Sequence, residues 1–549
     1  MRHGGIPFVP ELSGPSDDEA VVNEFPESMA TFDALEREML QRDLKAARFI
    51  AVLLEKNGTA LDVDYENERI PAGYTYLGQL ITHDMTFSSG IPSMGSPGGF
   101  GFRNYNSAVL DLDCIYRGGP QTSPLLYSVE DRLKPHSRWK LRLGYTTPLQ
   151  HSDFDWSELE DFGRFSVEGG VSNLPAYAEI NGPAGKCPHL ETAVGDLRNE
   201  DNLILSQLTV LFHKLHNYYA SILQRDYRIN RYEFGFMCAR YLTTKTYHNI
   251  IKYDYLQRIL NSDVHSRYLK GGVQQELPLS SHFFKKGAET VLPPEFTKAA
   301  MRFGHVMIRS RYRFNEKNHR SPINFLMKFN SEGNSPVTRV PLKSNWIIDW
   351  SQFFPQLSPD GSVAPGQDYI ASRRIAPAIS GYLTSNPSAI SDDALQGGDV
   401  SQDMRKSGLM FLDMVRGIRG HVATGQDLSE RLFGGHTISG DQVRAKMLQL
   451  LEKAANGAAS AEDVGFVDAL SKRTPLLLYL LIEADLTEAG ACLGKLGSTV
   501  LAEVILQALQ QSSGSLDEMI SEFRADFLTE IPLPRTMPDI LNLLSATVA

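Results

Sequence analysis

The chain of 549 residues is poor in cysteine, basic charge and long apolar runs. Its four cysteines, Cys114, Cys187, Cys238 and Cys492, stand at no spacing typical of a metal or redox motif, and nothing in the pattern requires disulfides. A net charge of −11 argues against nucleic acid or an anionic membrane as a partner, since both attract basic surfaces. The longest apolar run, 476–482, is too short to span a bilayer, so no membrane span is expected.

Targeting signals are also few. Residues 1–7 contain no apolar segment of the kind that a secretory signal needs. A cytoplasmic location is therefore the default expectation, with export by a non-classical route as the alternative. Residues 1–30 are rich in proline and acidic residues and predict an extended N-terminal arm. Residues 31–549 show no internal repeat and predict a single domain, and no signal in them indicates an oligomeric state.

Strand patterns are rare, the stretch 335–342 being one example, whereas helical periodicity recurs along the chain. Residues 88–104 predict a flexible loop, and 454–461 predict a small-residue linker or a helix end. Residues 330–400, rich in Pro, Ser and Asp, predict a long irregular insertion over the surface. The predicted fold class is mainly α: one large helical domain with long irregular loops and little β-structure.

The segment 76–85 combines an apolar helical pattern with three chemically useful side chains. Gln79 and His83 are four residues apart, so they project from the same helix face. Asp84 lies about 100° further round the helix and points elsewhere. Such a helix can offer an acid–base residue to a cavity and a carboxylate to a neighbouring loop. The ordinary alternative is a core histidine bound to a backbone carbonyl, with Asp84 as a surface charge.

The segment 107–116 alternates oxygen-bearing and apolar residues. Ser107, Asp111 and Asp113 would place their oxygens on one side of an extended loop, and the Val109 carbonyl can join them. Calcium takes six to eight oxygen ligands of this mixed kind, and Asp84 would add a further carboxylate. The alternative is a plain turn, since turns favour aspartate in any case.

The segment 195–202 precedes an amphipathic run from 203 to 220. Arg198 is its residue of interest, because a permanently charged guanidinium can stabilise a leaving oxygen without losing a proton. The alternative for the neighbouring acids Glu200 and Asp201 is a favourable interaction with the dipole of the following helix.

The segment 299–308 predicts an apolar helix with Gly304 directly before His305 and Arg302 three residues earlier. A glycine beside the histidine lets a flat cofactor approach the backbone closely. A histidine on an otherwise apolar face suits an axial metal ligand, although a core histidine is the default for any single example.

In this order, these segments resemble the animal haem peroxidase family, in the peroxidase–cyclooxygenase superfamily, and the chain looks like a bacterial-type member. The stretch 78–84 is similar to the family's distal motif, 107–116 to its calcium loop, 195–198 to its distal arginine motif and 302–305 to its proximal motif. The stretch 412–416 resembles the segment that supports the proximal histidine and a haem propionate, and 493–504 resembles a late helix. The resemblance covers roughly residues 70 to 510.

The resemblance implies haem b as a cofactor and assigns roles by position. His83 would be the distal base that moves a proton from one oxygen of hydrogen peroxide to the other. Arg198 would stabilise charge on the breaking O–O bond, and Gln79 would order water or halide. His305 would bind the haem iron. By the same resemblance Asp413 would support His305, Arg302 and Arg416 would pair with propionates, and Asp84, Ser107, Val109, Asp111 and Asp113 would hold calcium.

Several residues depart from the family pattern. Many members attach haem through two esters, but Thr82 stands where one of the carboxylates would be, and a hydroxyl cannot form that ester. Asp201 stands in place of the second carboxylate, with Glu200 beside it, and Asn202 stands where a sulfur-linked member has Met. Haem is therefore expected to be non-covalent, with a single ester through Asp201 as the alternative. Asp413 replaces the usual Asn, and a carboxylate there should lower the reduction potential of the iron.

The predicted function is a haem peroxidase that reduces hydrogen peroxide and oxidises a small organic donor or a halide, in keeping with a response to oxidative stress. A fatty-acid dioxygenase of the same superfamily is the first alternative. Its chemistry needs a tyrosine three residues before the proximal histidine, where this chain has Arg302. A calcium-stabilised binding or adhesion protein without turnover is the second, and such a scaffold has no need of His83, Arg198 and His305 together.

Overall fold

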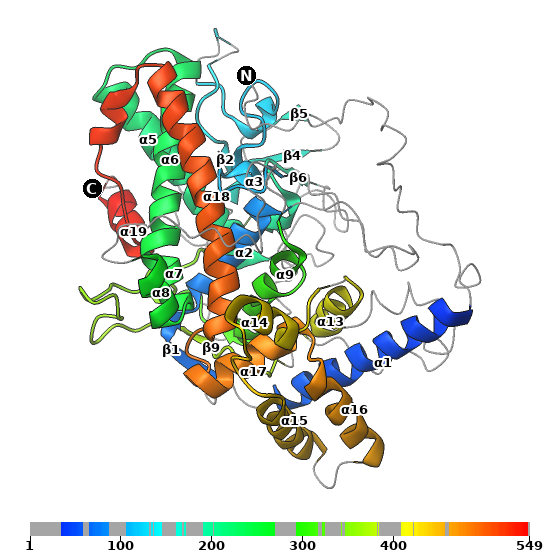
Figure 1. The fold of residues 1–549 in the computed structure, drawn as a ribbon. Coiled ribbons are helices and arrows are strands. Elements are labelled where there is room, and N and C mark those ends of the chain that lie inside the picture. Colours follow the sequence, from blue (N-terminus) through cyan, green and yellow to red (C-terminus); the bar gives the residue numbers. More distant parts are fainter. Residues whose placement is uncertain are drawn as a thin grey trace.

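The computed structural model describes residues 34–58, 65–86, 106–130, 133–134, 137–144, 161–166, 170–171, 190–200, 202–269, 292–316, 321–323, 342, 346–380, 383, 408–420, 422–455 and 460–546. Helices form most of the secondary structure in this part of the chain, and strands are short. The predicted mainly α class is therefore confirmed (Figure 1).

The α-helices of the described residues are α1 (Ala34–Asn57), α2 (Gly73–Met85), α3 (Asp113–Tyr116), α5 (Leu203–Arg225), α6 (Tyr232–Ile250), α7 (Leu256–Ile259), α8 (Ser262–Tyr268), α9 (Pro294–Thr297), α13 (Leu409–Arg419), α14 (Gly425–Phe433), α15 (Gly440–Ala455), α16 (Ala461–Lys472), α17 (Leu476–Glu488), α18 (Lys495–Glu522) and α19 (Met537–Ser545). The 3-10 helices are η3 (Pro124–Leu126), η4 (Leu197–Glu200), η7 (Ala300–Met307), η9 (Trp350–Gln352) and η12 (Asp526–Glu530), and η5 (Ile251–Tyr255) is a π-helix.

The strands are β1 (Glu66–Pro71), β2 (Leu143–Gly144), β3 (Asp161–Phe162), β4 (Arg164–Ser166), β5 (Gly170–Val171), β6 (Leu190–Thr192), β7 (Arg311–Tyr312), β8 (Ser321–Pro322) and β9 (Ala371–Arg373). All of them pair antiparallel: β1 with β9, β2 with β3, β7 with β8, and β4 with both β5 and β6. The register of β1 against β9 shifts between Asn67 and Pro71.

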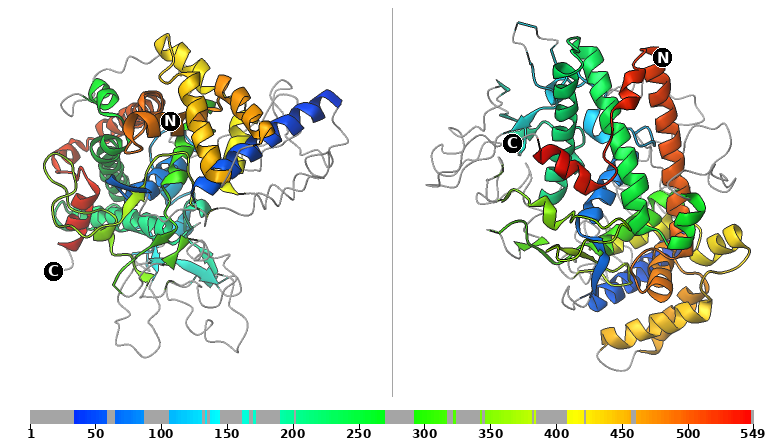
Figure 2. Two further views of the ribbon diagram at one scale, coloured as in Figure 1. Left: turned by 90° about the horizontal axis from the view of Figure 1, so that it is seen from below. Right: turned by 90° about the vertical axis from the view of Figure 1, so that its left-hand side faces the viewer.

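Three long helices, α5, α6 and α18, form the main body of the fold. They run side by side in Figure 1 and in the right-hand view of Figure 2, and α6 contacts both of the others. A buried hydrogen bond of 2.8 Å joins Tyr219 on α5 to Thr246 on α6. The N-terminus of α18 is bound by Glu483 of α17, whose carboxylate accepts hydrogen bonds from the backbone N–H groups of Leu496 and Gly497. A carboxylate in this place satisfies the unpaired donors of a helix N-terminus and opposes its dipole.

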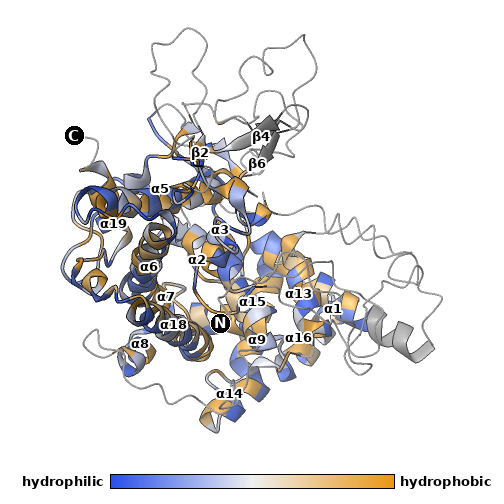
Figure 3. Cartoon of the chain, turned by 90° about the horizontal axis from the view of Figure 1, so that it is seen from above, coloured by the Kyte–Doolittle hydropathy of each residue, from blue (hydrophilic) through white to orange (hydrophobic). Residues whose placement is uncertain are grey.

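A second group of helices, α1, α15 and α16, lies to one side of this body (Figure 2), with α15 in contact with both α1 and α16. Helices throughout the fold carry both hydrophobic and hydrophilic residues (Figure 3), as amphipathic helices around a shared core do. One large cluster of buried apolar side chains extends from Leu44 to Ile540 and includes residues of both groups. None of the described helices combines the length and the apolar character that crossing a membrane requires.

The helix α2 lies at the centre of the fold and contacts α5, η5 and η7. Its first turn is fixed by Tyr74, whose hydroxyl hydrogen-bonds the buried carboxylate of Asp254 at 2.7 Å, while Arg258 binds the same carboxylate at 2.9 Å. A Cβ added at Gly78 would lie 2.6 Å from the Tyr255 hydroxyl, so glycine is required for this close packing. The residues of 76–85 therefore form the predicted buried helix, and its position is set by a buried polar network.

The predicted helix at 203–220 is confirmed by α5, which the Asn202 side chain caps by accepting the Leu205 N–H at 2.9 Å. The segment 299–308 is helical as predicted, but it forms the 3-10 helix η7. The predicted helix end at 454–461 is confirmed, since α15 ends at Ala455 and α16 begins at Ala461.

The prediction that 330–400 lies over the surface is wrong for its longest described part, 346–380. Phe353, Phe354 and Ile375 are fully buried there, and β9 pairs with β1. Phe354 packs edge-to-face on Tyr74 of α2 with ring centroids 5.1 Å apart. An irregular, proline-containing backbone can thus deliver aromatic side chains to the core, and composition alone misses this because it records no side-chain direction.

Other sequence predictions fall outside the described residues: the arm 1–30, the loop 88–104, Cys187, Asp201 and most of the strand 335–342. The cysteines Cys114, Cys238 and Cys492 are buried and free.

Candidate functional site

Two side chains of α2 face the segment that connects η4 to α5. The imidazole Nδ1 of His83 lies 2.9 Å from Asn199 Oδ1, and Gln79 Oε1 accepts a hydrogen bond from Asn202 Nδ2 at 3.4 Å. The predicted common face of Gln79 and His83 is therefore confirmed. The alternative in which a backbone carbonyl binds the His83 ring is wrong, because the partner of Nδ1 is a side-chain amide.

His83 is buried, and burial together with the positive charge of Arg198 lowers the pKa of its imidazole to about 4. Its ring is therefore neutral near pH 7, so one nitrogen carries hydrogen and the other can accept a proton. Because Nδ1 faces a carbonyl oxygen, Nδ1 carries the hydrogen and Nε2 is the acceptor. This protonation state is the one that a general base needs.

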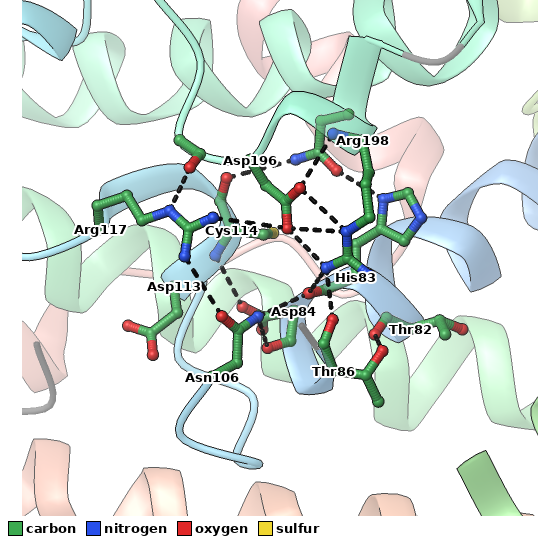
Figure 4. Close-up of polar contacts among 12 residues, drawn as sticks. Thr82, His83, Asp84, Thr86, Asn106, Asp113, Cys114, Arg117, Asp196 and Arg198 are labelled. Atoms are coloured by element: carbon green, nitrogen blue, oxygen red, sulfur yellow. Dashed lines mark hydrogen bonds and ion pairs between the residues drawn. The ribbon is translucent and has the colours of Figure 1, made fainter. Parts of the chain in front are cut away.

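Arg198 lies beside this imidazole on η4. Its guanidinium donates to the buried carboxylate of Asp196 at 2.6 Å and to the His83 carbonyl at 3.1 Å, and it also binds the Thr86 carbonyl. Figure 4 shows Arg198 between Asp196 and the C-terminal end of α2. Burial alone would raise the pKa of Asp196, but the hydrogen bonds from Arg198 outweigh it and lower that pKa. Arg198 is thus a charged group held in place by at least three contacts.

The C-terminal end of α2 is tied to the loop that begins at Asn106. The Asn106 amide Nδ2 donates to the carbonyls of His83 and Asp84 at 2.8 and 2.9 Å. Arg117 reaches back across the same loop, with its guanidinium 3.4 Å from Asn106 Oδ1 and 3.7 Å from Asp196 (Figure 4). These contacts satisfy helix carbonyls that would otherwise lack partners.

The predicted oxygen-rich loop lies directly against Asp84. The carboxylate of Asp84 is fully buried and accepts the N–H groups of Leu112 and Cys114 at 3.0 and 3.4 Å. Asp84 is therefore not a surface charge, and it points to the loop as predicted. Ser107 donates from its hydroxyl to Asp111 at 3.1 Å and from its backbone N–H to Asp113 at 3.4 Å. Ser107, Asp111 and Asp113 are thus brought together, whereas the part of the Val109 carbonyl stays a prediction.

The loop gathers three carboxyl groups whose protonated forms are favoured by burial and by their mutual proximity. Burial and the charge of Asp113 raise the pKa of Asp84 to about 8, and burial and the same neighbour also raise the pKa of Asp111. Arg240 on α6 lies 3.9 Å from Asp111 and 3.8 Å from Asp113. The Oδ1 atom of Asp113 is buried and receives no hydrogen bond from the described residues.

These carboxylates do not converge on one point. In the described ranges, no group of three or more His, Cys, Asp or Glu side chains is arranged to hold a metal ion as it stands. The reason is visible at Asp84, whose two oxygens are directed to backbone N–H groups. The donor chemistry of buried carboxylate and hydroxyl oxygens nevertheless fits a hard divalent cation.

A second polar cluster surrounds His305 on η7. The His305 Nδ1 atom lies 2.5 Å from Asp413 Oδ2 on α13, while Asp413 Oδ1 accepts from Arg302 at 2.7 Å and from Arg416 at 3.2 Å. Asp413 is completely buried, which alone would raise its pKa, but the charges of His305 and Arg302 hold that pKa well below its usual range. Asp413 is therefore an ionised partner of the imidazole.

Space remains beside this imidazole. The His305 side chain is 29% exposed, and a Cβ added at the neighbouring Gly304 would meet no atom within 4 Å. Nδ1 is directed at Asp413, so Nε2 is the nitrogen left to bind a ligand. His83 lies on α2 and His305 lies on η7, and these two helices are in contact.

The residues discussed for haem attachment are placed as follows. The Thr82 hydroxyl donates to the Gly78 carbonyl at 2.8 Å, within its own helix. Glu200 is buried and accepts a hydrogen bond from Thr192. Asp201 lies outside the described residues.

Five residues of this site were not predicted from the sequence: Asn106, Arg117, Asp196, Asn199 and Arg240. Asp196 belongs to the segment 195–198, in which only Arg198 was given a role. Asn106 precedes the oxygen-rich loop by one residue, and a helix that ends at Met85 without a capping residue was a signal that a distant amide would be needed. Asn199 and Arg240 are far from their partners in sequence, and no spacing in the chain points to them.

Comparison with known families agrees with this arrangement. The family model described as animal haem peroxidase matches residues 159–344, a range that includes Arg198 and His305. Peroxidase A from Dictyostelium discoideum has a similar fold, with a TM-score of 0.52 and 15% sequence identity over 84% of this chain and 82% of that chain. Fatty acid alpha-dioxygenase from Oryza sativa matches with a TM-score of 0.48 and 12% identity over 90% of this chain and 77% of that chain. No curated protein matches the chain.

The mainly α fold and the family match agree with the resemblance to the animal haem peroxidase family that the motifs predicted. The family match extends over residues 159–344, and the similarity to the solved structures is one of fold.

Proposed function

We propose that this protein is a haem-dependent peroxidase that reduces hydrogen peroxide and oxidises a small organic donor or a halide. The observation that supports this most directly is the pairing of two different histidines. His83 is neutral, buried and close to the cation Arg198, whereas His305 is bound to the ionised carboxylate of Asp413. One imidazole is thus prepared to move a proton and the other to donate to a metal.

The described residues fit haem b on the side of His305. The open space beside Gly304 accommodates a flat group, and Nε2 of His305 is the nitrogen that would bind its iron. Arg302 and Arg416 are 23% and 26% exposed at their side chains and border the same cluster, so their remaining donors suit propionates. Bound there, haem would supply the redox chemistry that peroxide reduction and donor oxidation require.

His83 would move the proton. Its Nε2 would take a proton from one oxygen of hydrogen peroxide and return it to the other, so that water can leave, while haem held by His305 would supply the two electrons that breaking the O–O bond consumes. Arg198, fixed by Asp196, stabilises the negative charge that develops on the leaving oxygen. Gln79 lies on the same helix face and orders water or halide in the cavity. All three groups are held by hydrogen bonds to buried residues, so they are oriented before peroxide arrives.

A bound calcium ion is part of the proposal. Asp84, Ser107, Asp111 and Asp113, with the Val109 carbonyl, supply the hard oxygen atoms that calcium prefers. A divalent cation would balance the three carboxyl groups of Asp84, Asp111 and Asp113, two of which lie near Arg240. Asp113 Oδ1 is a buried acceptor without a hydrogen bond from the described residues. Because Asp84 follows His83 in sequence, holding its carboxylate fixes the end of α2.

Haem is proposed to be held without covalent bonds. The Thr82 hydroxyl is engaged with the Gly78 carbonyl and lacks the carboxylate that an ester needs. Glu200 is buried against Thr192, which leaves Asp201 as the residue for the alternative of a single ester. A fatty-acid dioxygenase is disfavoured, because Arg302 occupies the position of the tyrosine that such chemistry needs and binds Asp413.

The test of this function is the rate at which haem-loaded protein reacts with hydrogen peroxide, compared between the wild type and His83→Ala. General acid–base catalysis is typically worth about 10² to 10⁴-fold, so the rate should fall in that range while haem affinity is kept. His436→Ala serves as control, since His436 is exposed and outside the site. A near-normal rate for His83→Ala would remove His83 from the catalytic role.

A further inference from the structure

Asn199 makes a side-chain contact that the roles above do not use. It is completely buried, it belongs to η4, and its Oδ1 lies 2.9 Å from Nδ1 of His83. Among the described residues, Asn199 is thus the hydrogen-bond partner of the His83 ring. The other contacts of His83, from Asn106 and Arg198, go to its backbone carbonyl and leave the ring free to rotate.

The orientation of the Asn199 amide is itself fixed. Its Nδ2 lies 3.4 Å from the carbonyl oxygen of Cys114, and only the nitrogen of an amide can donate to a carbonyl. The amide oxygen is therefore the atom that faces His83. An oxygen without hydrogen can only accept, so it selects the tautomer of His83 with hydrogen on Nδ1.

We propose that Asn199 is the positioning residue of the distal base: it holds the His83 ring in the tautomer that leaves Nε2 unprotonated and directed away from η4. This inference rests on the proposed function, because it matters only if His83 is that base. It also makes Cys114, in the oxygen-rich loop, an indirect support of the ring. The loop 106–117 thus holds His83 twice, at its carbonyl through Asn106 and at its ring through Asn199.

A purely structural role for Asn199 is the competing explanation. In that case the amide would stabilise η4 by its contact with Cys114, and the imidazole would keep its orientation through packing alone. The two explanations differ in one respect. Positioning acts only through the His83 ring, so removing the ring must remove the effect of Asn199, whereas a structural effect persists without the ring.

The experiment is a double-mutant cycle with Asn199→Leu and His83→Ala in the haem-loaded full chain, read by cyanide association. Hydrogen cyanide must give up its proton on the distal side when it binds iron as cyanide, and its binding needs no turnover. The variant Asn57→Leu is the matched control. Asn57, at the end of α1, is also buried, and its Nδ2 donates to the carbonyls of Leu53 and Leu450. None of these hydrogen bonds involves His83.

We expect Asn199→Leu to slow cyanide association about ten- to a hundredfold, the usual effect of losing a partner that orients an active group, with haem content unchanged. The double variant Asn199→Leu/His83→Ala should bind cyanide at a rate within about twofold of that of His83→Ala alone. Asn57→Leu should leave the rate unchanged. An equal loss in both backgrounds, or a similar loss with Asn57→Leu, would overturn the positioning role in favour of a structural one.

Two other outcomes separate this inference from the proposed function. If His83→Ala slows cyanide association but Asn199→Leu does not, the inference is overturned and the distal base stands. If neither variant changes the rate, His83 is not the distal base, and both the proposed role of His83 and the inference built on it are overturned.

Discussion

Asp413 Oδ2 lies 2.5 Å from Nδ1 of His305, and the other oxygen of the same carboxylate binds Arg302 and Arg416. The carboxylate is completely buried, yet the charges around it keep its pKa well below the usual range, so it remains an anion. An anion at this distance attracts the hydrogen on Nδ1 and thereby makes Nε2 a stronger electron-pair donor to a bound metal. A stronger donor stabilises the oxidised iron.

The first prediction concerns the reduction potential. Asp413→Asn keeps the shape of the side chain and removes its charge, so the potential of the bound haem iron should rise. Chloride oxidation, expected to be poor in the wild type compared with iodide or phenolic donors, should improve. Spectroelectrochemical titration measures the potential, with the exposed Asp441→Asn as control. A potential that stays constant or falls would contradict the role given to the carboxylate.

The second prediction concerns calcium. Elemental analysis of the purified protein should find calcium, and a strong chelator should remove it with loss of peroxide reactivity, because α2 loses the cation beside Asp84. Asp113→Asn should weaken calcium retention, since Asp113 Oδ1 lacks a hydrogen-bond donor among the described residues. Full reactivity in a chelated protein that contains no calcium would eliminate the ion from the proposal.

The third prediction concerns haem attachment. Acidified organic solvent should extract most of the haem from the wild type, because Thr82 offers no carboxylate. In Thr82→Asp, repeated treatment with peroxide should leave a larger fraction of haem on the polypeptide, detected by mass spectrometry. Haem that resists extraction from the wild type would contradict the non-covalent arrangement and direct attention to Asp201 or Glu200.

The fourth prediction is a pH dependence of stability. Glu55 on α1 is buried, its Oε1 has no hydrogen-bond partner in the described residues, and burial raises its pKa to about 8 from an ordinary value of 4.5. Between these values the folded chain keeps a proton that the unfolded chain has lost, so Glu55 destabilises the fold increasingly as pH rises. Glu55→Gln should therefore stabilise the protein at pH 7, by about 3 kcal/mol at most.

The measurement for Glu55 is thermal unfolding of both proteins across pH 4 to 8. The difference in melting temperature between Glu55→Gln and the wild type should be largest near pH 8 and vanish near pH 4, where Glu55 is protonated in both states. A difference that is independent of pH would show that Glu55 is not a buried titrating group.

Much of the fold was predictable because helical periodicity is local. The segment 76–85 predicted α2, and the four-residue spacing of Gln79 and His83 predicted their common face. The buried part of 346–380 was not predictable, since its packing depends on Phe353 and Phe354 meeting distant helices and not on any period. Local patterns thus identify elements, whereas irregular segments are placed by tertiary contacts.

The candidate site shows the same limit. The motifs gave His83, Arg198 and His305, each with its chemistry, but not the residues that orient them. Asn199 is 116 positions from His83 in sequence, and Asp413 is 108 from His305. The pairing of Arg302 with Asp413 also depends on how η7 meets α13. The contacts of Arg302 and Arg416 with propionates stay a prediction.

The central claim is most directly tested by the absorption spectrum of the purified protein before and after hydrogen peroxide is added. We expect a Soret band that shifts when peroxide is added and returns to its first position when a phenolic donor or iodide is added next. In His305→Ala the band should be weak or absent, because the axial nitrogen is lost. A wild-type Soret band that peroxide leaves unchanged would contradict peroxidase activity, and an unchanged spectrum in His305→Ala would contradict the assignment of the iron ligand.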